Sequence, residues 1–84
     1  MIGKRIKDGE FPENPGEYSK HRTDRGIVWF ATAPKSGMSC GSLMNHTVVE
    51  HEDETITVTP SIIMDMGDGQ VWHGYLEHGI WREC

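Results

Sequence analysis

Turn-forming residues interrupt this sequence so often that no segment keeps the apolar spacing of a helix. Pro12, Pro15 and Gly16 break the first part of the chain, and a proline in a helix interior removes a backbone hydrogen bond and clashes with the preceding turn. Further along, glycine-rich turns separate short runs of β-branched and aromatic residues, which is the pattern of strands joined by tight turns. The sequence therefore predicts a mainly β protein that contains no helix.

The pattern predicts about five short strands, arranged as a small antiparallel meander or a partly closed barrel. We expect these strands at residues 27–32, 46–49, 55–64, 71–76 and 80–82. Pro60 has no amide hydrogen to donate, so the third strand should lie at a sheet edge or break at that residue. Residues 1–26 show no 3.6-residue apolar period and contain several helix-breaking prolines and glycines, so they are expected to form an irregular N-terminal arm. The β domain proper is expected to span residues 27–84.

The segment VWHGYLEHGIW is predicted to be a structural hairpin. Strand alternation places Trp72 on the face toward the core and His73 on the opposite face. The tight turn that follows needs a residue with positive φ, which Gly79 supplies. Two placements of Trp81 are open: it meets Trp72 in the core, or it is the one exposed tryptophan of three and lies at an interface, where tryptophan is enriched.

The charge of the chain is unevenly distributed. The net charge is −5; residues 1–26 hold six basic and five acidic residues, whereas residues 27–84 hold two basic and eight acidic ones. Nucleic-acid binding needs clustered lysine and arginine to neutralise phosphates, so the acidic part favours a basic protein surface instead, with ordinary solubility as the alternative. The candidate interaction residues are the acids of the stretch EHEDE together with one tryptophan: Glu50, Glu52, Asp53, Glu54 and Trp81.

Histidines and cysteines give the candidate metal ligands, namely Cys40, His46, His73 and His78. Their spacing does not match the close ligand pairs of zinc sites, because His73 is expected in a strand and His78 in the turn after it. Cys40 between small residues, with His46 or His73 beside it, lacks a third group that would orient the base. We therefore expect no metal, no cofactor, no catalytic residue and no enzymatic activity.

The stretches TITVTPSI and WHGYLEHGIW resemble a group of small uncharacterised proteins of phages and prophages. In that group a strand ending in a Pro-Ser-Ile-like turn precedes a His-aromatic strand, a tight glycine turn and a terminal aromatic residue. The resemblance spans Thr55 to Trp81 and implies a phage origin and a small β fold, with no established activity. Some members carry a Cys-Gly-Cys cluster ahead of the turn that looks metal-binding, whereas this sequence has Cys40 alone there.

Together these features predict a small phage-encoded accessory protein that acts by protein–protein interaction. It would inhibit a host factor or defence system, as anti-CRISPR and host-takeover proteins do. One alternative is an oligomeric structural or small-ligand-sequestering phage module, and another is a small metal-binding domain. The expected partner is a host or phage protein, or a second copy of the chain. No run reaches the ~18–20 apolar residues of a membrane helix and no signal-peptide pattern opens the sequence, so we expect no membrane contact and a place in the cytoplasm of the host cell.

Overall fold

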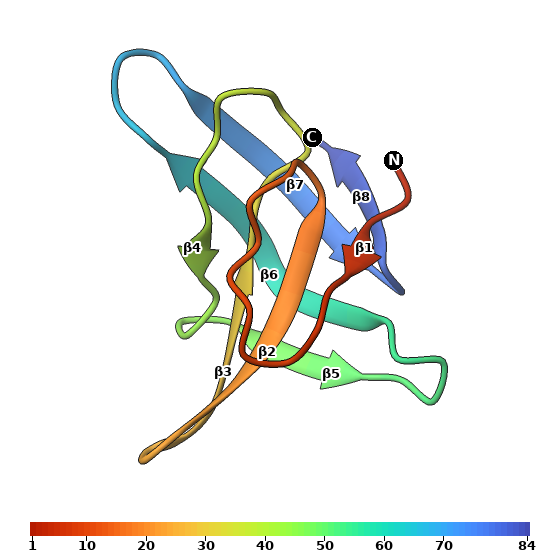
Figure 1. Ribbon diagram of the computed structural model, residues 1–84. Coiled ribbons are helices and arrows are strands. Elements are labelled where there is room, and N and C mark those ends of the chain that lie inside the picture. Colours follow the sequence, from red (N-terminus) through yellow and green to blue (C-terminus); the bar gives the residue numbers. More distant parts are fainter.

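The regular structure of the protein consists entirely of β-strands. The computed structural model describes residues 1–84 (Figure 1). It contains eight strands: β1 (Lys4–Arg5), β2 (Glu17–Thr23), β3 (Gly26–Ala31), β4 (Gly41–Ser42), β5 (Thr47–Glu50), β6 (Ile56–Asp65), β7 (Val71–Glu77) and β8 (Ile80–Glu83). The predicted mainly β class is confirmed, and the number of strands is eight instead of about five.

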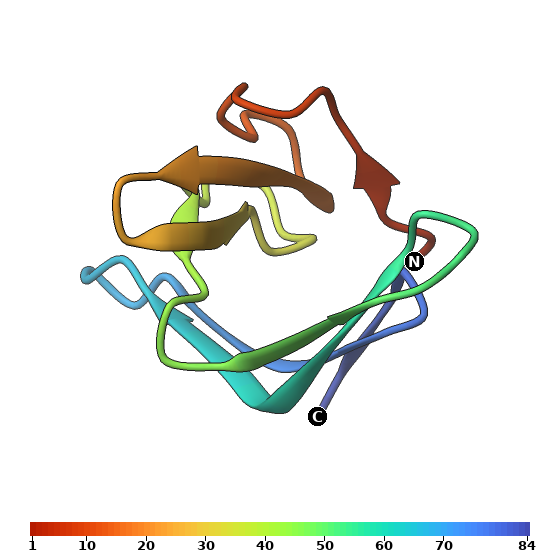
Figure 2. The ribbon, with the colours of Figure 1, turned by 90° about the horizontal axis from the view of Figure 1, so that it is seen from below.

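The strands form two four-stranded sheets that face each other as layers (Figure 2). One sheet has the order β1-β2-β3-β4, and the other is the meander β5-β6-β7-β8. All pairs are antiparallel except β1 with β2, which is parallel. The two sheets do not close into a barrel.

The first residues of the chain join the two sheets along one side. The amide of Gly3 donates to the carbonyl of Gly79 at 2.7 Å, and the amide of Trp81 donates to the carbonyl of Met1 at 2.8 Å. Directly after this contact with β8, the chain continues as β1 beside β2. On the other side, the strands β3 and β5 are not paired with each other.

The irregular N-terminal arm predicted for residues 1–26 is shorter than expected, because β2 begins at Glu17. Polar side chains on the face of β2 that the preceding loop covers, opposite the core face of Tyr18, hid this strand from the sequence pattern. Ser19 and His21 are both buried, and both hydrogen-bond to the carbonyl of Glu10 in the preceding loop. The loop thus supplies the partners that allow a polar strand to be buried.

Strand β6 changes its pairing at Pro60, as the missing amide hydrogen predicts. It pairs with β5 as far as Thr59, and its register with β7 shifts between Val58 and Ile62, which marks a β-bulge. Neither the edge position nor the break is found, because β6 is continuous from Ile56 to Asp65 and lies inside the sheet; the bulge accommodates the missing donor instead. Beyond the bulge, β6 pairs with β7 only.

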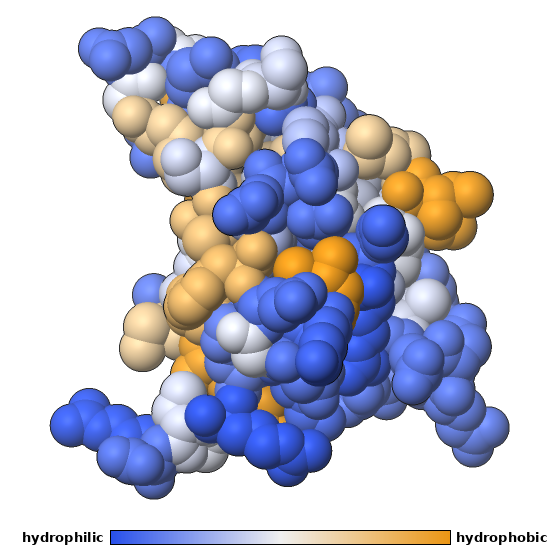
Figure 3. All heavy atoms as spheres, in the orientation of Figure 1, coloured by the Kyte–Doolittle hydropathy of each residue, from blue (hydrophilic) through white to orange (hydrophobic).

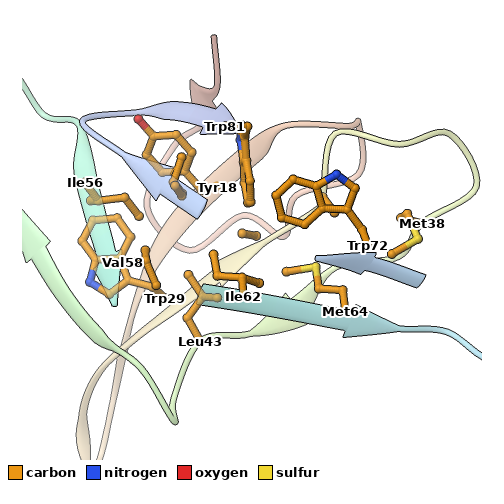
Figure 4. Packing of buried hydrophobic residues seen from close by; sticks show 13 residues of the cluster. Tyr18, Trp29, Met38, Leu43, Ile56, Val58, Ile62, Met64, Trp72 and Trp81 are labelled. Atoms are coloured by element: carbon orange, nitrogen blue, oxygen red, sulfur yellow. The ribbon is translucent and has the colours of Figure 1, made fainter. Parts of the chain in front are cut away.

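The core lies between the sheets and is rich in aromatic side chains (Figure 4). It contains thirteen buried apolar residues, and all three tryptophans are among them. Trp72 and Trp81 are 3% and 2% exposed, respectively, and the indole Nε1 of Trp81 donates to the carbonyl of Gly16 at 2.9 Å. The core placement of Trp72 and Trp81 is therefore confirmed. The alternative, Trp81 as an exposed interaction residue, is wrong, because its ring is covered by the arm and by Trp72.

The closing hairpin has the predicted geometry. His73 is exposed on the face opposite Trp72, and Gly79 has φ 75°. His78 also has a positive φ, 48°, and two consecutive residues of this kind form the two-residue turn that matches the twist of antiparallel strands.

Candidate functional site

The surface cavity that is lined mainly by apolar residues is a groove between β3 and β5, on the open side of the two sheets. It encloses about 320 Å³. Its walls come from the β2–β3 hairpin, the segment between β4 and β5, and β5 itself. Nine residues line it: Lys20, Ile27, Val28, Trp29, Leu43, Met44, His46, Val48 and Glu50. Figure 3 shows hydrophobic side chains in a hollow on the flank that carries β4 and the β4–β5 loop.

Two apolar side chains at this groove are largely exposed, Ile27 at 52% and Met44 at 71%. Ile27 lies two residues before the buried Trp29 and therefore points to the same, inward face of β3. The β2–β3 hairpin extends away from the rest of the sheets at this point (Figure 1), and the side chain of Ile27 stays half exposed. The groove thus offers apolar surface to a ligand.

Ionic contacts close one end of the groove. The carboxylate of Glu50 accepts hydrogen bonds from Lys20 Nζ at 2.9 Å and from Arg5 at 2.7 Å. These bonds, first from Lys20 and then from Arg5, hold the pKa of the Glu50 carboxyl below its ordinary value. Both cations also lie over the ring of Trp29, at 5.1 Å for Arg5 and 5.8 Å for Lys20. Glu50 therefore ties β5 to β1 and β2.

The remaining acids of the predicted interaction stretch form the turn between β5 and β6. Asp53 accepts hydrogen bonds from the hydroxyl and the amide of Thr55, and these lower the pKa of its carboxyl. Glu54 has φ 72°, and its carbonyl accepts a hydrogen bond from Arg5 at 3.1 Å. The carboxylates of Glu52 and Glu54 make no hydrogen bond or ion pair within the chain and are exposed. These two side chains carry the free negative charge at this end of β5.

The predicted candidate metal ligands are spread over the molecule. His46 Nε2 donates to the carbonyl of Ser61 at 3.1 Å, which leaves its buried Nδ1 without a hydrogen-bond partner. His78 stacks on His51 with ring centroids 3.9 Å apart, away from His73. No three histidine, cysteine, aspartate or glutamate side chains are grouped so that they could hold a metal ion. Cys40 is a free thiol.

A contact that sequence reasoning missed joins His73 to the neighbouring strand. His73 Nε2 lies 2.9 Å from Ser61 Oγ and 3.9 Å from Cys84 Sγ. The pairing of Ile63 with His73 across β6 and β7 brings Ser61 close, but the bulge at Pro60 shifts the register in a way that residue spacing does not reveal. The three side chains lie outside the surface cavities.

No protein-family model, curated protein or solved structure matched this chain. The structure also has no helix of the length and apolarity needed to cross a membrane.

Proposed function

We propose that this chain is a small interaction protein that binds a partner protein through the groove between β3 and β5. The observation that carries the proposal is the exposure of Ile27 and Met44 at the rim of an apolar hollow. Exposed apolar surface of this kind, rimmed by polar groups such as Lys20 and Glu50, is typical of contact sites for other macromolecules. No catalytic role is part of the proposal.

The sequence resemblance supports a more specific form of the proposal. In that form the protein is a phage accessory protein, and its partner is a host protein that it inhibits or redirects. The net charge of −5 favours a partner with a basic surface, which would also be attracted over a distance.

A second candidate function, self-association into an oligomeric module, is favoured by a different surface. Met1, Ile2 and Ile80 are all exposed where the first residues pair with β8. This surface lies where the sheets are joined, and the groove lies on their open side.

Capture experiments with two matched variants test the proposal. The tagged protein is incubated with host lysate as the wild type, as Ile27→Asp/Met44→Asp, and as Ile80→Asp. We expect one host protein to be retained by the wild type and by Ile80→Asp but lost from the groove variant, with unchanged melting curves. Retention by the groove variant, or no captured protein at all, contradicts the proposal. A doubled mass that only Ile80→Asp abolishes supports the oligomeric module instead.

A further inference from the structure

The groove has a second property, which concerns backbone groups rather than side chains. We infer that its occupant is an extended segment of the partner that pairs with the free edge of β5 as an added strand. This inference rests on the proposed function and specifies how the partner is recognised.

The edge of β5 that faces the groove is unpaired. β5 is the outermost strand of its sheet and pairs only with β6. The amide of His51 donates to the carbonyl of Thr55, so residues 47, 49 and 51 direct their backbone groups toward β6, and Val48 and Glu50 direct theirs away from it. The N–H and C=O groups of Val48 and Glu50 therefore point out of the sheet, where an added strand would find them.

The opposite wall presents a second, shorter edge. The carbonyl of Trp29 accepts a hydrogen bond from the amide of Leu43, which shows that residue 29 directs its backbone groups to the β4 side. By the same alternation Ile27 does so too, and it lies three residues before Phe30, where the pairing with β4 ends. Unpaired backbone groups thus line the groove on both walls, and a polypeptide in the extended conformation is the ligand that can satisfy them.

Side chains determine which extended segment fits. Val48 and Ile27 line the groove with apolar surface, so alternate side chains of the added strand, those that face inward, should be apolar. The free carboxylates of Glu52 and Glu54 lie just beyond the end of β5, so the segment should carry basic residues there. A second copy of β5 fits less well, because neither flank of that strand, residues 42–46 or 51–55, carries a lysine or arginine to meet Glu52 and Glu54.

The experiment uses the full chain labelled with ¹⁵N and a synthetic peptide of alternating valine and threonine that ends in two lysines. Two further peptides carry N-methyl groups, one on every valine amide and the other on every threonine amide. One edge of an added strand pairs along β5, whereas the other edge meets only Ile27. We therefore expect one N-methylated peptide to lose much more affinity than the other. Bound peptide should slow amide exchange of Val48 and Glu50 by about tenfold or more, the scale of one hydrogen bond made or lost. A peptide ending in two glutamates should bind more weakly.

Variants of the protein provide an independent test of strand pairing. Val48→Pro removes an outward N–H and leaves the bonds of Thr47 and Val49 to β6 intact, so it should lower the affinity for the lysine peptide about tenfold. Val49→Thr, on the outer face of the same strand, is the matched control and should bind as the wild type does. If Val48→Pro fails to fold, the two N-methylated peptides still test whether the bound peptide pairs with β5.

The outcomes separate this inference from the proposed function. Equal binding of both N-methylated peptides, or unchanged exchange at Val48 and Glu50 with the parent peptide, overturns strand pairing. If strand pairing is overturned but the capture of a host protein still depends on Ile27 and Met44, the proposed function stands without strand pairing. Slow exchange at both amides in the absence of peptide, together with a doubled mass, would identify a second copy as the occupant and would equally overturn the inference.

Discussion

The indole rings of Trp72 and Trp81 meet edge to face across β7 and β8, with centroids 5.3 Å apart and planes at 84°. This is a favoured geometry for aromatic pairs, and it places two large side chains at the centre of a small core.

Replacement of Trp72 by alanine should cost about 3–5 kcal/mol of unfolding free energy, the range for deletion of a buried large aromatic side chain. Since a domain of this size has a stability of only about 5 kcal/mol or slightly more, the variant should be largely unfolded. His73→Ala, on the exposed face of the same strand, is the control and should cost under about 1 kcal/mol. Thermal melting of both variants checks the prediction, and a folded Trp72→Ala would contradict it.

Gly74 should not tolerate a side chain. A methyl group at this position would overlap the ring of Trp72 and the backbone carbonyl of Arg82. Gly74→Ala should therefore destabilise the protein by at least the roughly 1–3 kcal/mol that overpacking of a core costs. Gly41→Ala is the matched control, because its added carbon would meet only the end of Met64 at an ordinary contact distance of 3.9 Å. Equal denaturation midpoints for the two variants would show that β7 can shift to make room.

Trp81→Phe should separate ring packing from hydrogen bonding. The variant keeps an aromatic ring but removes the N–H that donates to the buried carbonyl of Gly16. The carbonyl of Gly16 keeps its bond from the amide of Lys4 at 3.0 Å, so the variant should lose only the roughly 0.5–1.5 kcal/mol of one typical hydrogen bond. The loss should also loosen the arm. Hydrogen exchange should therefore become faster for the Gly3 amide in particular. A uniform increase over all amides would instead indicate a loss of global stability alone.

The ion pairs of Glu50 predict a specific dependence of stability on pH. The pKa of this carboxyl is lower in the folded state than in the unfolded chain, so its contribution is present above the ordinary carboxyl pKa and is lost as pH falls through the lowered value. Glu50→Gln should thus be less stable than the wild type near neutral pH, and the difference should shrink in acid. Urea denaturation at a series of pH values measures this. A constant difference down to about pH 2, below ordinary carboxyl pKa values, would mean that the charge of Glu50 is not what matters.

The free acids next to the groove should affect the rate of association more than the fold. Glu52→Lys/Glu54→Lys reverses two exposed charges and leaves Asp53 in its turn. We expect an unchanged melting temperature, slower binding of the lysine peptide, and a weaker dependence of the on-rate on salt, because exposed charges act through screened, long-range attraction. Stopped-flow kinetics at two salt concentrations would show this. An unchanged on-rate would mean that these acids are solvated without a role in binding.

Alternation in the sequence predicted the hairpin of β7 and β8 well, since Trp72 and Gly79 carry strong local signals. It missed β2, because the buried Ser19 and His21 are satisfied by the carbonyl of Glu10, nine and eleven residues away. The groove was equally hidden, because Ile27 and Val48 belong to different sheets. Glu50 was predicted as a free interaction residue, yet its partner Arg5 lies 45 positions earlier. Local patterns report which face of a strand is buried, whereas contacts between distant strands depend on the assembled fold.

The backbone hydrogen bonds between residues 1–3 and β8 have a consequence for folding during synthesis. The backbone bond between Met1 and Trp81 spans almost the whole sequence, and contacts between such distant residues form slowly because a long loop must close first. During synthesis, the residues of β1 to β4 are all made well before the ribosome reaches Trp81. At that stage the second sheet is not yet there to pack against them. The nascent chain therefore exposes Trp29 and the inner face of β2 until the strands of the second sheet have been made.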